Sequence, residues 1–487
     1  MKRSNIALAV TFSISALFLS ACGGDSKNQF DTSVPTYLSE TPYDANKTQL
    51  PVEAAESIGA KSINVMTYNM VDVQGKIAKA TAMVMFPKVA PPADGYRTVV
   101  WAHGTVGVGD GCAPSQNVLN PRFSILAQTL LKAGYVIIAP DYEGLGTKGI
   151  HPYLNLKSES VSAIAAVKAL KDRYGSQLQG SWMSIGQSQG GHASLGIAEF
   201  ANKDNSYKGA VAGAPASSLG QIIQIYIDPA MNQASGYTVS MLDQAIMGRR
   251  QIDAAIAAGE MSPNDPLALA VPTIDQTAEG YAELLAYAAF ASVGIKAQQT
   301  NYDFKNIFTD NAAEIAELAY GRTGDDGLCL SYPAPNNADG LQEKFKAGIL
   351  AYLSNPTHKI TDYGIDLDKF KTDPVVSDFL VKTQPATNAT AEQIIKTPVL
   401  IIQGERDQAV LPDVTKRLVD KMKLKAPEYA SGYKFELVPN ATHTQAIVCR
   451  NKLAVDFIQE HMSAGSDIVL TDEDKDASQS PHCKGAS

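Results

Sequence analysis

A serine set among glycines is the first feature of the chain that could do chemistry. In SWMSIGQSQGGHASLG (residues 181–196), Ser188 lies between Gly186 and Gly190, and Gly191 follows directly. A nucleophilic serine on a tight strand-to-helix turn has this pattern, because the turn leaves no room for side chains two residues away on either side. The five-residue pattern also arises by chance, so its context must decide whether Ser188 is a nucleophile.

A serine hydroxyl becomes a good nucleophile only when a neighbouring base takes its proton. His443 lies in PNATHTQ (residues 439–445), after the last predicted core strand, on the sheet edge toward which Ser188 also points. The other six histidines precede the serine, lie just inside the helix after it, or fall in the helical insertion and C-terminal region: His103, His151, His192, His358, His461 and His482. His443 is therefore the expected general base.

The base needs a carboxylate that fixes its tautomer. Asp407 follows the strand run PVLII, in GERDQAV, on the same sheet edge. The order Ser188, Asp407, His443 is the one expected for a serine hydrolase of this strand-turn-helix type, and the 36 residues from acid to base hold one helix and one strand. Glu405 is the alternative acid, although it lies closer to the strand end. A solvated loop carboxylate is the alternative interpretation of Asp407.

A tetrahedral oxyanion needs two backbone N–H donors. Gln189, directly after the predicted nucleophile, is expected to supply one of them. The second is expected from the glycine-rich loop WAHGTVGVGDGCAPS, with Thr105 preferred and Val106 as the alternative. Gly104 and Gly107 would let this backbone approach a ligand closely.

Two further polar residues near this edge are expected to have structural roles. His103 is predicted to be a structural hydrogen-bonding residue. Asp141, in PDYEGLG, is predicted to order the loop that follows its strand.

The alternation of strands and helices that must position these residues indicates an α/β doubly wound fold. Six short apolar runs are typical of strands buried on both faces of a parallel sheet: residues 98–102, 135–139, 181–186, 209–213, 398–402 and 434–438. An antiparallel hairpin is predicted over residues 62–86, and helices are predicted from Pro121 to Gly134, over 158–174 and over 413–425.

A long interval between the fourth and fifth runs, rich in Ala, Tyr, Leu and Ile at helical spacing, breaks this alternation. We interpret it as a helical cap inserted before the acid-bearing strand, with helices including residues 281–293 and 311–320. The cap would roof the cleft, and its apolar residues could line an acyl pocket: Ile222, Ile223, Ile225, Tyr226, Ile227 and residues 287–290. Packing of the cap on the core is the more ordinary role for most of them.

The whole chain has 487 residues, 45% of them hydrophobic, and a formal net charge of -9. The acidic balance argues against nucleic acid as a partner. The predicted organisation is a signal peptide (1–21), a tether (22–55), a first core segment (56–218), the cap (219–394), a second core segment (395–466) and a tail (467–487).

The N-terminus predicts export. A short basic start and an apolar stretch over residues 6–19 end in LSACG, which resembles a bacterial lipoprotein signal with Cys22 as the acylated residue. The alternative is an ordinary signal peptide cut after Ala21. Acylation of Cys22 would anchor the chain to the lipid bilayer of the cell envelope. The resemblance to lipoprotein signals further implies the outer membrane, because Gly23 and not Asp follows the cysteine.

Four cysteines remain after Cys22, and their even number favours disulfide bonds in an exported protein. They allow three connectivities, of which Cys112–Cys329 with Cys449–Cys483 is preferred. No cysteine or histidine spacing predicts a metal site, and no cofactor is implied.

The motifs WAHGTVGVGDGCAPS, APDYEGLGTKGIHPYL, GQSQGGHAS and PVLIIQGERDQAV together resemble the secretory lipase (lipase A-like) branch of the α/β-hydrolases. The resemblance spans most of residues 60–460, and only the kind of element is similar in the cap. It implies Ser188, Asp407 and His443 as a catalytic triad and hydrolysis of a carboxylic ester or lipid without a cofactor.

Two other functions are compatible with such a triad. A serine peptidase of prolyl-oligopeptidase-like type uses the same chemistry, but its β-propeller does not fit between Cys22 and the first hairpin. A non-catalytic binding module on a hydrolase fold would usually lack a triad residue, whereas every position is filled here. The ester hydrolase is therefore the favoured prediction.

Overall fold

One mixed sheet of nine strands organises the residues that the computed structural model describes, which are 36–44, 51–227, 239–331, 340–387, 394–463 and 465–486. The strands are β1 (Tyr37–Pro42), β2 (Ala60–Val71), β3 (Ile77–Pro87), β4 (Tyr96–Ala102), β5 (Val136–Pro140), β6 (Leu178–Gln187), β7 (Tyr207–Gly213), β8 (Val399–Gly404) and β9 (Tyr433–Val438). Their order across the sheet is β1-β2-β3-β5-β4-β6-β7-β8-β9. The pairs from β1 to β5 are antiparallel, and those from β5 to β9 are parallel.

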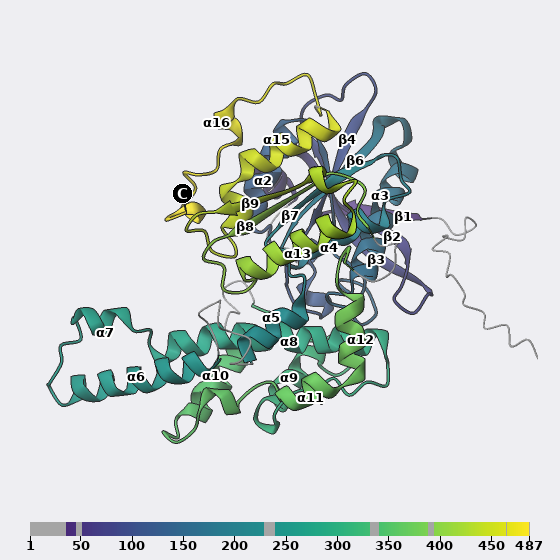
Figure 1. Ribbon diagram of the computed structural model, residues 1–487. Coiled ribbons are helices and arrows are strands. Elements are labelled where there is room, and N and C mark those ends of the chain that lie inside the picture. Colours follow the sequence, from purple (N-terminus) through teal and green to yellow (C-terminus); the bar gives the residue numbers. More distant parts are fainter. Residues whose placement is uncertain are drawn as a thin grey trace, which may run out of the picture.

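Helices cover both faces of this sheet (Figure 1). One face packs against α1 (Pro51–Ser57), α2 (Pro121–Lys132), α14 (Ala446–Cys449) and α15 (Asn451–Met462). The other packs against α3 (Leu156–Tyr174), α4 (Gln189–Phe200) and α13 (Pro412–Lys425). Alternate residues of one strand serve opposite faces: Leu400 and Ile402 lie in the first core, and Val399 and Ile401 lie in the second. This explains the continuous apolar runs of the parallel strands.

A helical cap lies between β7 and β8, as the long interval in the sequence predicts (Figure 1). Its described helices are α5 (Leu219–Ile227), α6 (Val239–Ala257), α7 (Pro266–Ala270), α8 (Ile274–Gln298), α9 (Asp310–Tyr320), α10 (Leu341–Leu353), α11 (Leu367–Thr372) and α12 (Pro374–Lys382). The long helix α8 is the centre of a separate apolar core, to which Phe290, Phe308 and Phe345 contribute. Helices α6 and α7 extend away from the rest of the cap.

The predicted fold class, a doubly wound, mostly parallel α/β sheet with an inserted helical cap, is therefore confirmed. All six apolar runs are strands of the parallel part, and the hairpin over residues 62–86 is β2 and β3. The preferred disulfide bonds are also present: Cys112 is bonded to Cys329, and Cys449 to Cys483. The second of these bonds ties the tail, which contains the short helix α16 (Asp472–Lys475), to the core.

The expected tether over residues 22–55 is wrong in its later part. Residues 37–42 form β1, which pairs with β2 at the sheet edge, and residue 51 begins α1. The sequence signal is weak because β1 is an edge strand with several exposed side chains, so it lacks the apolar run of the central strands. The predicted signal peptide and Cys22 lie outside the described residues.

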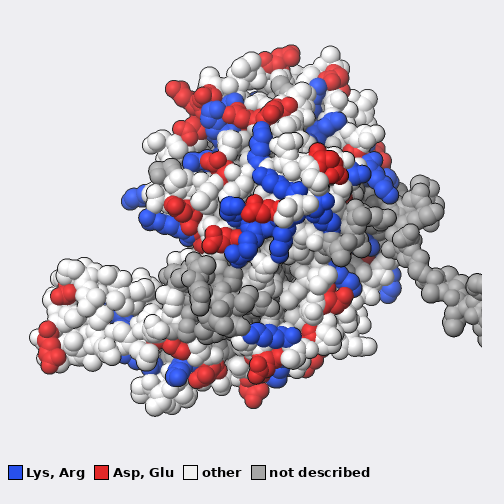
Figure 2. Space-filling view, viewed as in Figure 1, with Lys and Arg blue, Asp and Glu red and all other residues white. Residues whose placement is uncertain are grey.

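No helix in the described part of the chain has the length and apolar character needed to cross a membrane. On the face drawn in Figure 2, acidic and basic side chains are interspersed over the core. Much of the surface of the extended α6–α7 part of the cap is uncharged in the same view.

Candidate active site

Ser188 lies on the sharp turn between β6 and α4. Its φ of 59° is in the left-handed region, which a non-glycine residue adopts only when its surroundings enforce it. The Ser188 N–H donates to the carbonyl of Gly213 at 2.8 Å, and its carbonyl accepts from the N–H groups of His192 and Ala216 at 3.0 Å. These backbone hydrogen bonds fix the conformation of the turn. The hydroxyl group of Ser188 is left at the surface of a cavity.

The three glycines around Ser188 are required by close backbone packing. A Cβ atom at Gly186 would lie 2.5 Å from the carbonyl oxygen of Ala102, and one at Gly190 would lie 1.8 Å from the same oxygen. At Gly191 it would lie 2.5 Å from the oxygen of Gly213. The glycines therefore allow α4 to start directly against the ends of β4 and β7.

His443 and Asp407 meet at the same sheet edge. Nδ1 of His443 donates to Oδ2 of Asp407 at 2.8 Å, and the carbonyl of His443 accepts from the side-chain amide of Gln187 at 2.8 Å. The second bond ties the histidine loop to the residue that precedes Ser188. Ser188 and His443 both line the two cavities described below.

The Asp407 carboxylate is held by four donors. Oδ1 accepts from the backbone N–H groups of Ala409 and Val410 at 2.9 and 2.8 Å. Oδ2 accepts from the side-chain amide of Gln403 at 2.8 Å as well as from His443. Asp407 is only 2% exposed, so this carboxylate has one orientation, directed at the imidazole.

Electrostatics around His443 favour its protonated form. Burial alone would lower the pKa of His443, but the charge and hydrogen bond of Asp407 outweigh it, and the net shift is upward. Glu283 on the cap adds to the increase, whereas Arg122 on α2 opposes it. A histidine held in this way can take a proton from a neighbouring hydroxyl group and stabilise the resulting charge.

Glu405, the alternative acid, does not contact His443. Its side chain is exposed, and Oε2 accepts from the backbone N–H of Asn440 at 3.0 Å. Both residues assigned structural roles make structural contacts, but the Asp141 carboxylate holds the loop after β4 and the strand β3 instead of the predicted loop after its own strand, β5. The His103 ring contacts the carbonyls of Gly104 and Asp141, and the buried Asp141 carboxylate accepts from the Ser115 N–H and the Thr81 hydroxyl.

The predicted oxyanion residues flank Ser188. Thr105 lines both cavities, and its hydroxyl shares a hydrogen bond of 2.6 Å with the hydroxyl of Tyr153. Gln189 is fully buried at the start of α4.

The expectation for Gly107 needs correction. A Cβ there would lie 2.7 Å from Cα of Cys329 and 2.8 Å from Sγ of Cys112, so this glycine makes room for a disulfide bond and not for a ligand. Gly104, in contrast, lines a cavity together with Ser188, and a Cβ there would lie 3.2 Å from the carbonyl oxygen of Gln187. A sequence pattern does not distinguish a glycine that makes room for another part of the chain from one that makes room for a ligand, because both positions require the absence of a side chain.

The loop that carries Thr105 is attached to the cap. The disulfide bond Cys112–Cys329 joins them, Gly107 forms a β-bridge with Cys329, and the N–H of Leu330 donates to the carbonyl of Val106 at 2.9 Å. The cap thus helps to hold the loop in place next to Ser188.

A buried polar network below the serine turn was not predicted from the sequence. The fully buried Glu159 on α3 accepts from the side-chain amide of Gln189 at 2.9 Å and from Nδ1 of His192 at 2.9 Å. The other nitrogen of His192 contacts the carbonyl of Thr383, next to α12 of the cap. The spacing of Glu159 within its helix does not indicate that it is a buried acceptor. The only sequence signal is weak: His192 is a polar residue in a mostly apolar helix.

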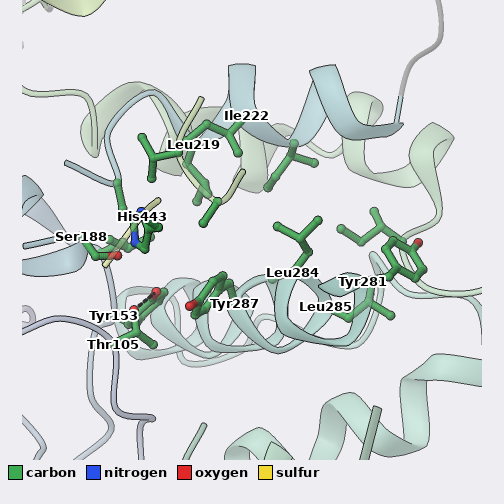
Figure 3. A pocket seen from close by; sticks show the side chains of 17 residues that line it. Thr105, Tyr153, Ser188, Leu219, Ile222, Tyr281, Leu284, Leu285, Tyr287 and His443 are labelled. Carbon is green, nitrogen blue, oxygen red and sulfur yellow. Dashed lines mark hydrogen bonds between the residues drawn. The ribbon is translucent and has the colours of Figure 1, made fainter. Parts of the chain in front are cut away.

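A narrow apolar cavity of about 60 Å³ leads away from Ser188 between the core and the cap. Figure 3 shows Ser188 and His443 at one end and Tyr281 and Leu285 at the other. One side is formed by α5 and the other by α8 (Figure 3). The residues that line it are Thr105, Tyr153, Leu154, Ser188, Ala216, Leu219, Ile222, Ile223, Tyr281, Leu284, Leu285, Tyr287, Ala288, Ile365, Ala409, Val410 and His443.

The predicted apolar lining is correct for part of the set. Ile222, Ile223, Tyr287 and Ala288 line this inner cavity, whereas Phe290 is fully buried in the cap core. The side chains at 225–227 lie outside the described residues.

A second, wider cavity of about 590 Å³, the outer cavity, also reaches Ser188 and His443. It is lined by the Thr105 loop, the first turn of α2 and part of α8, and it contains charged and polar side chains that include Arg122 and Glu283. Tyr287 lines both cavities and donates a hydrogen bond to Glu283. Ser188 is therefore located between a narrow apolar space and a wider space with a mixed lining of apolar, polar and charged side chains. In the described ranges, no three or more His, Cys, Asp or Glu side chains form a group that could hold a metal ion.

Comparisons with known proteins establish similarity in fold. No protein-family model matches the chain, and no curated protein matches its sequence. Among solved structures, it is similar to lipase A from Candida antarctica, with 14% identity, a TM-score of 0.57, and coverage of 91% of this chain and 87% of the other. It is also similar to a rice cell wall degrading esterase from Xanthomonas oryzae, with 16% identity, a TM-score of 0.52, and coverage of 88% and 97%.

Proposed function

We propose that this chain is a serine carboxylic-ester hydrolase of the lipase or esterase type. The observation that carries the proposal is the hydrogen bond from His443 to the buried Asp407, at the end of a cavity that Ser188 also lines. The strained turn at Ser188 supports it further, because such strain persists where it presents a side chain for a function. Two of the solved structures of similar fold, those compared above, are a lipase and an esterase, which agrees with the proposal.

The proposed mechanism uses an acyl-enzyme. Nε2 of His443 takes the proton of Ser188 as Oγ bonds to the ester carbonyl carbon, and the carbonyl oxygen becomes an oxyanion. The N–H groups of Gln189 and Thr105 stabilise this oxyanion. The carbon–oxygen bond to the alcohol then breaks, and the alcohol leaves with the proton from His443.

Water completes the cycle by the same steps. His443 takes a proton from the water molecule as the water oxygen attacks the acyl carbon. The bond from the acyl carbon to Oγ breaks, Ser188 recovers its proton from His443, and the carboxylic acid is released. Asp407 remains ionised throughout and orients the imidazole.

The inner cavity is the proposed site of the acyl chain. Its lining beyond the catalytic residues is almost wholly apolar, so an alkyl chain there would be removed from water. Each buried methylene contributes roughly 0.8 kcal/mol, which corresponds to about a fourfold gain in kcat/KM per methylene until the cavity is full. We therefore expect kcat/KM to rise from acetyl to medium-length acyl esters.

Kinetics on nitrophenyl esters of increasing acyl length, with triglyceride emulsions and a peptide amide in parallel, test the proposal. Ser188→Ala and His443→Ala are expected to lose ester hydrolysis while they keep the thermal unfolding profile of the parent. Residual ester turnover within about tenfold of the parent would show that these residues are not the nucleophile and base. Faster cleavage of the peptide amide than of any ester would favour the peptidase alternative.

We also propose that the chain is exported and anchored through an acylated Cys22. Two disulfide bonds are typical of proteins in oxidising compartments, which supports export. The lipoprotein-like sequence around Cys22 supports the anchor, with the outer membrane as the proposed location.

A further inference from the structure

Arg122 is a charged residue of the outer cavity for which the proposed mechanism has no use. It is the second residue of α2, and it lines this cavity together with Ser188, His443 and Tyr287. The side chain is partly buried, and burial lowers its pKa. A guanidinium group that has lost part of its water shell needs another partner, because desolvation of a charge is costly.

No described carboxylate supplies that partner. None lies within ion-pair distance of the Arg122 guanidinium, and the guanidinium donates no hydrogen bond within the described ranges. Other arginines with shielded side chains are compensated. Arg97 pairs with Asp94 at 2.6 Å, and Arg249 pairs with Asp253 at 2.7 Å. Arg122 is thus a cation on the wall of a cavity, with its donors available to a ligand.

The cation is close enough to the reaction centre to affect it. Arg122 lowers the pKa of His443, in opposition to Asp407 and Glu283. Glu283, the acidic residue of this cavity, is on the cap and already accepts a hydrogen bond from Tyr287. The outer cavity therefore has a positive side on α2 and a negative side on α8.

We propose that Arg122 binds an anionic group, a carboxylate or a phosphate, on the alcohol portion of the ester. This inference rests on the proposed ester hydrolysis. With the acyl chain in the apolar inner cavity, the alcohol portion must extend from Ser188 into the outer cavity. A guanidinium group presents a planar fork of donors that matches the two oxygens of a carboxylate or phosphate. Glu283 repels an anion from the cap, which directs it toward α2.

Paired substrates of equal acyl length test this assignment. One pair is the octanoyl esters of glycolate and of neutral glycolamide, and the other is the octanoyl esters of glycerol phosphate and of glycerol. The parent enzyme should prefer the anionic member of at least one pair. Arg122→Gln should lower the anionic-to-neutral ratio of kcat/KM by about tenfold or more, since a charge-assisted bond is lost. Arg122→Lys should restore part of the ratio because it keeps the charge.

Arg417→Gln is the matched control, because this substitution removes the same charge. Arg417 is exposed on α13 and lines neither cavity. The control should leave the ratio as in the parent. A change confined to the glycolate pair identifies a carboxylate, and one confined to the glycerol pair identifies a phosphate. Equal preference for both members in the parent, or an unchanged ratio in Arg122→Gln, would overturn the assignment. An equal loss on all four esters would also overturn it, because it indicates a structural role. If the parent enzyme cleaves neither the four octanoyl esters nor any nitrophenyl ester, ester hydrolysis itself is refuted.

Discussion

Replacement of Leu284 by tryptophan should shorten the acyl chain that the enzyme prefers. Leu284 is partly buried on α8 and lines the inner cavity between Tyr287, near Ser188, and Tyr281, at the far end (Figure 3). Tyr287 and Tyr281 are six residues apart, which is about 9 Å along a helix that rises about 1.5 Å per residue. Carbon–carbon bonds of about 1.52 Å at about 111° advance about 1.25 Å per methylene. The cavity is thus about as long as a chain of seven methylenes, and because its volume is only about 60 Å³, a chain of that length requires the lining side chains to move apart.

An indole group at position 284 would close the cavity halfway, about 4.5 Å from Tyr287, and would exclude three or four methylenes. At roughly 0.8 kcal/mol per methylene, the variant should lose about 3 kcal/mol of discrimination between octanoyl and butanoyl esters. That is on the order of 100-fold in the ratio of their kcat/KM values.

The assay is kcat/KM for nitrophenyl esters from acetyl to dodecanoyl, with parent and variant in parallel. Leu269→Trp is the control, because Leu269 on α7 is 70% exposed and lines neither cavity. The control should keep the parent profile, and Leu284→Trp should keep its rate on acetyl ester. An unchanged optimum in Leu284→Trp would show that the acyl chain does not occupy the inner cavity. A parent profile that falls steadily from acetyl would indicate an acetyl esterase.

Three further changes have defined outcomes. Activity should fall as pH decreases through the raised pKa of His443, because the imidazole must be neutral to act as a base. Asp407→Asn removes the charge that offsets the lowering of this pKa by burial, so the acid limb of the pH profile of kcat/KM should move to lower pH. The same variant should lose kcat on the order of 1,000-fold or more. Removal of the disulfide bond by Cys112→Ala with Cys329→Ala should lower the free energy of unfolding in urea by about 2–5 kcal/mol. It should also lower kcat more than it changes KM. An unchanged kcat would contradict a role of the cap in holding the loop that carries Thr105. Cys22→Ser should move the enzyme from the detergent phase to the aqueous phase without loss of kcat/KM, and equal partitioning of parent and variant would refute the anchor.

The parts of the fold and site that sequence predicts are those with a local signal. The central strands are buried on both faces, so each is a short apolar run between turn residues. Ser188 is marked by glycines that close packing requires, and Asp407 and His443 follow from the chain order of strands whose carboxyl ends share one edge.

The remaining features depend on contacts between distant segments. Glu159 and Gln189 are 30 residues apart, and nothing in the helical pattern of α3 marks Glu159 as a buried acid. Arg122 has the spacing of an ordinary helix residue, and only the structure places it in the same cavity as His443. The strand β1 was missed because its exposed edge needs no apolar run. The inner cavity likewise depends on how α5 and α8 are oriented over the core, which no single segment encodes.

Covalent trapping of the nucleophile tests the central proposal most directly. A nitrophenyl alkylphosphonate with an octyl chain mimics the tetrahedral intermediate and forms a stable bond to an activated serine. We expect release of one nitrophenolate per chain, with the phosphonate found by peptide mass spectrometry on Ser188. His443→Ala should react far more slowly because its serine is not activated. Labelling of a different residue, or equal labelling rates in the parent and His443→Ala, would contradict the proposed Ser188–His443–Asp407 mechanism.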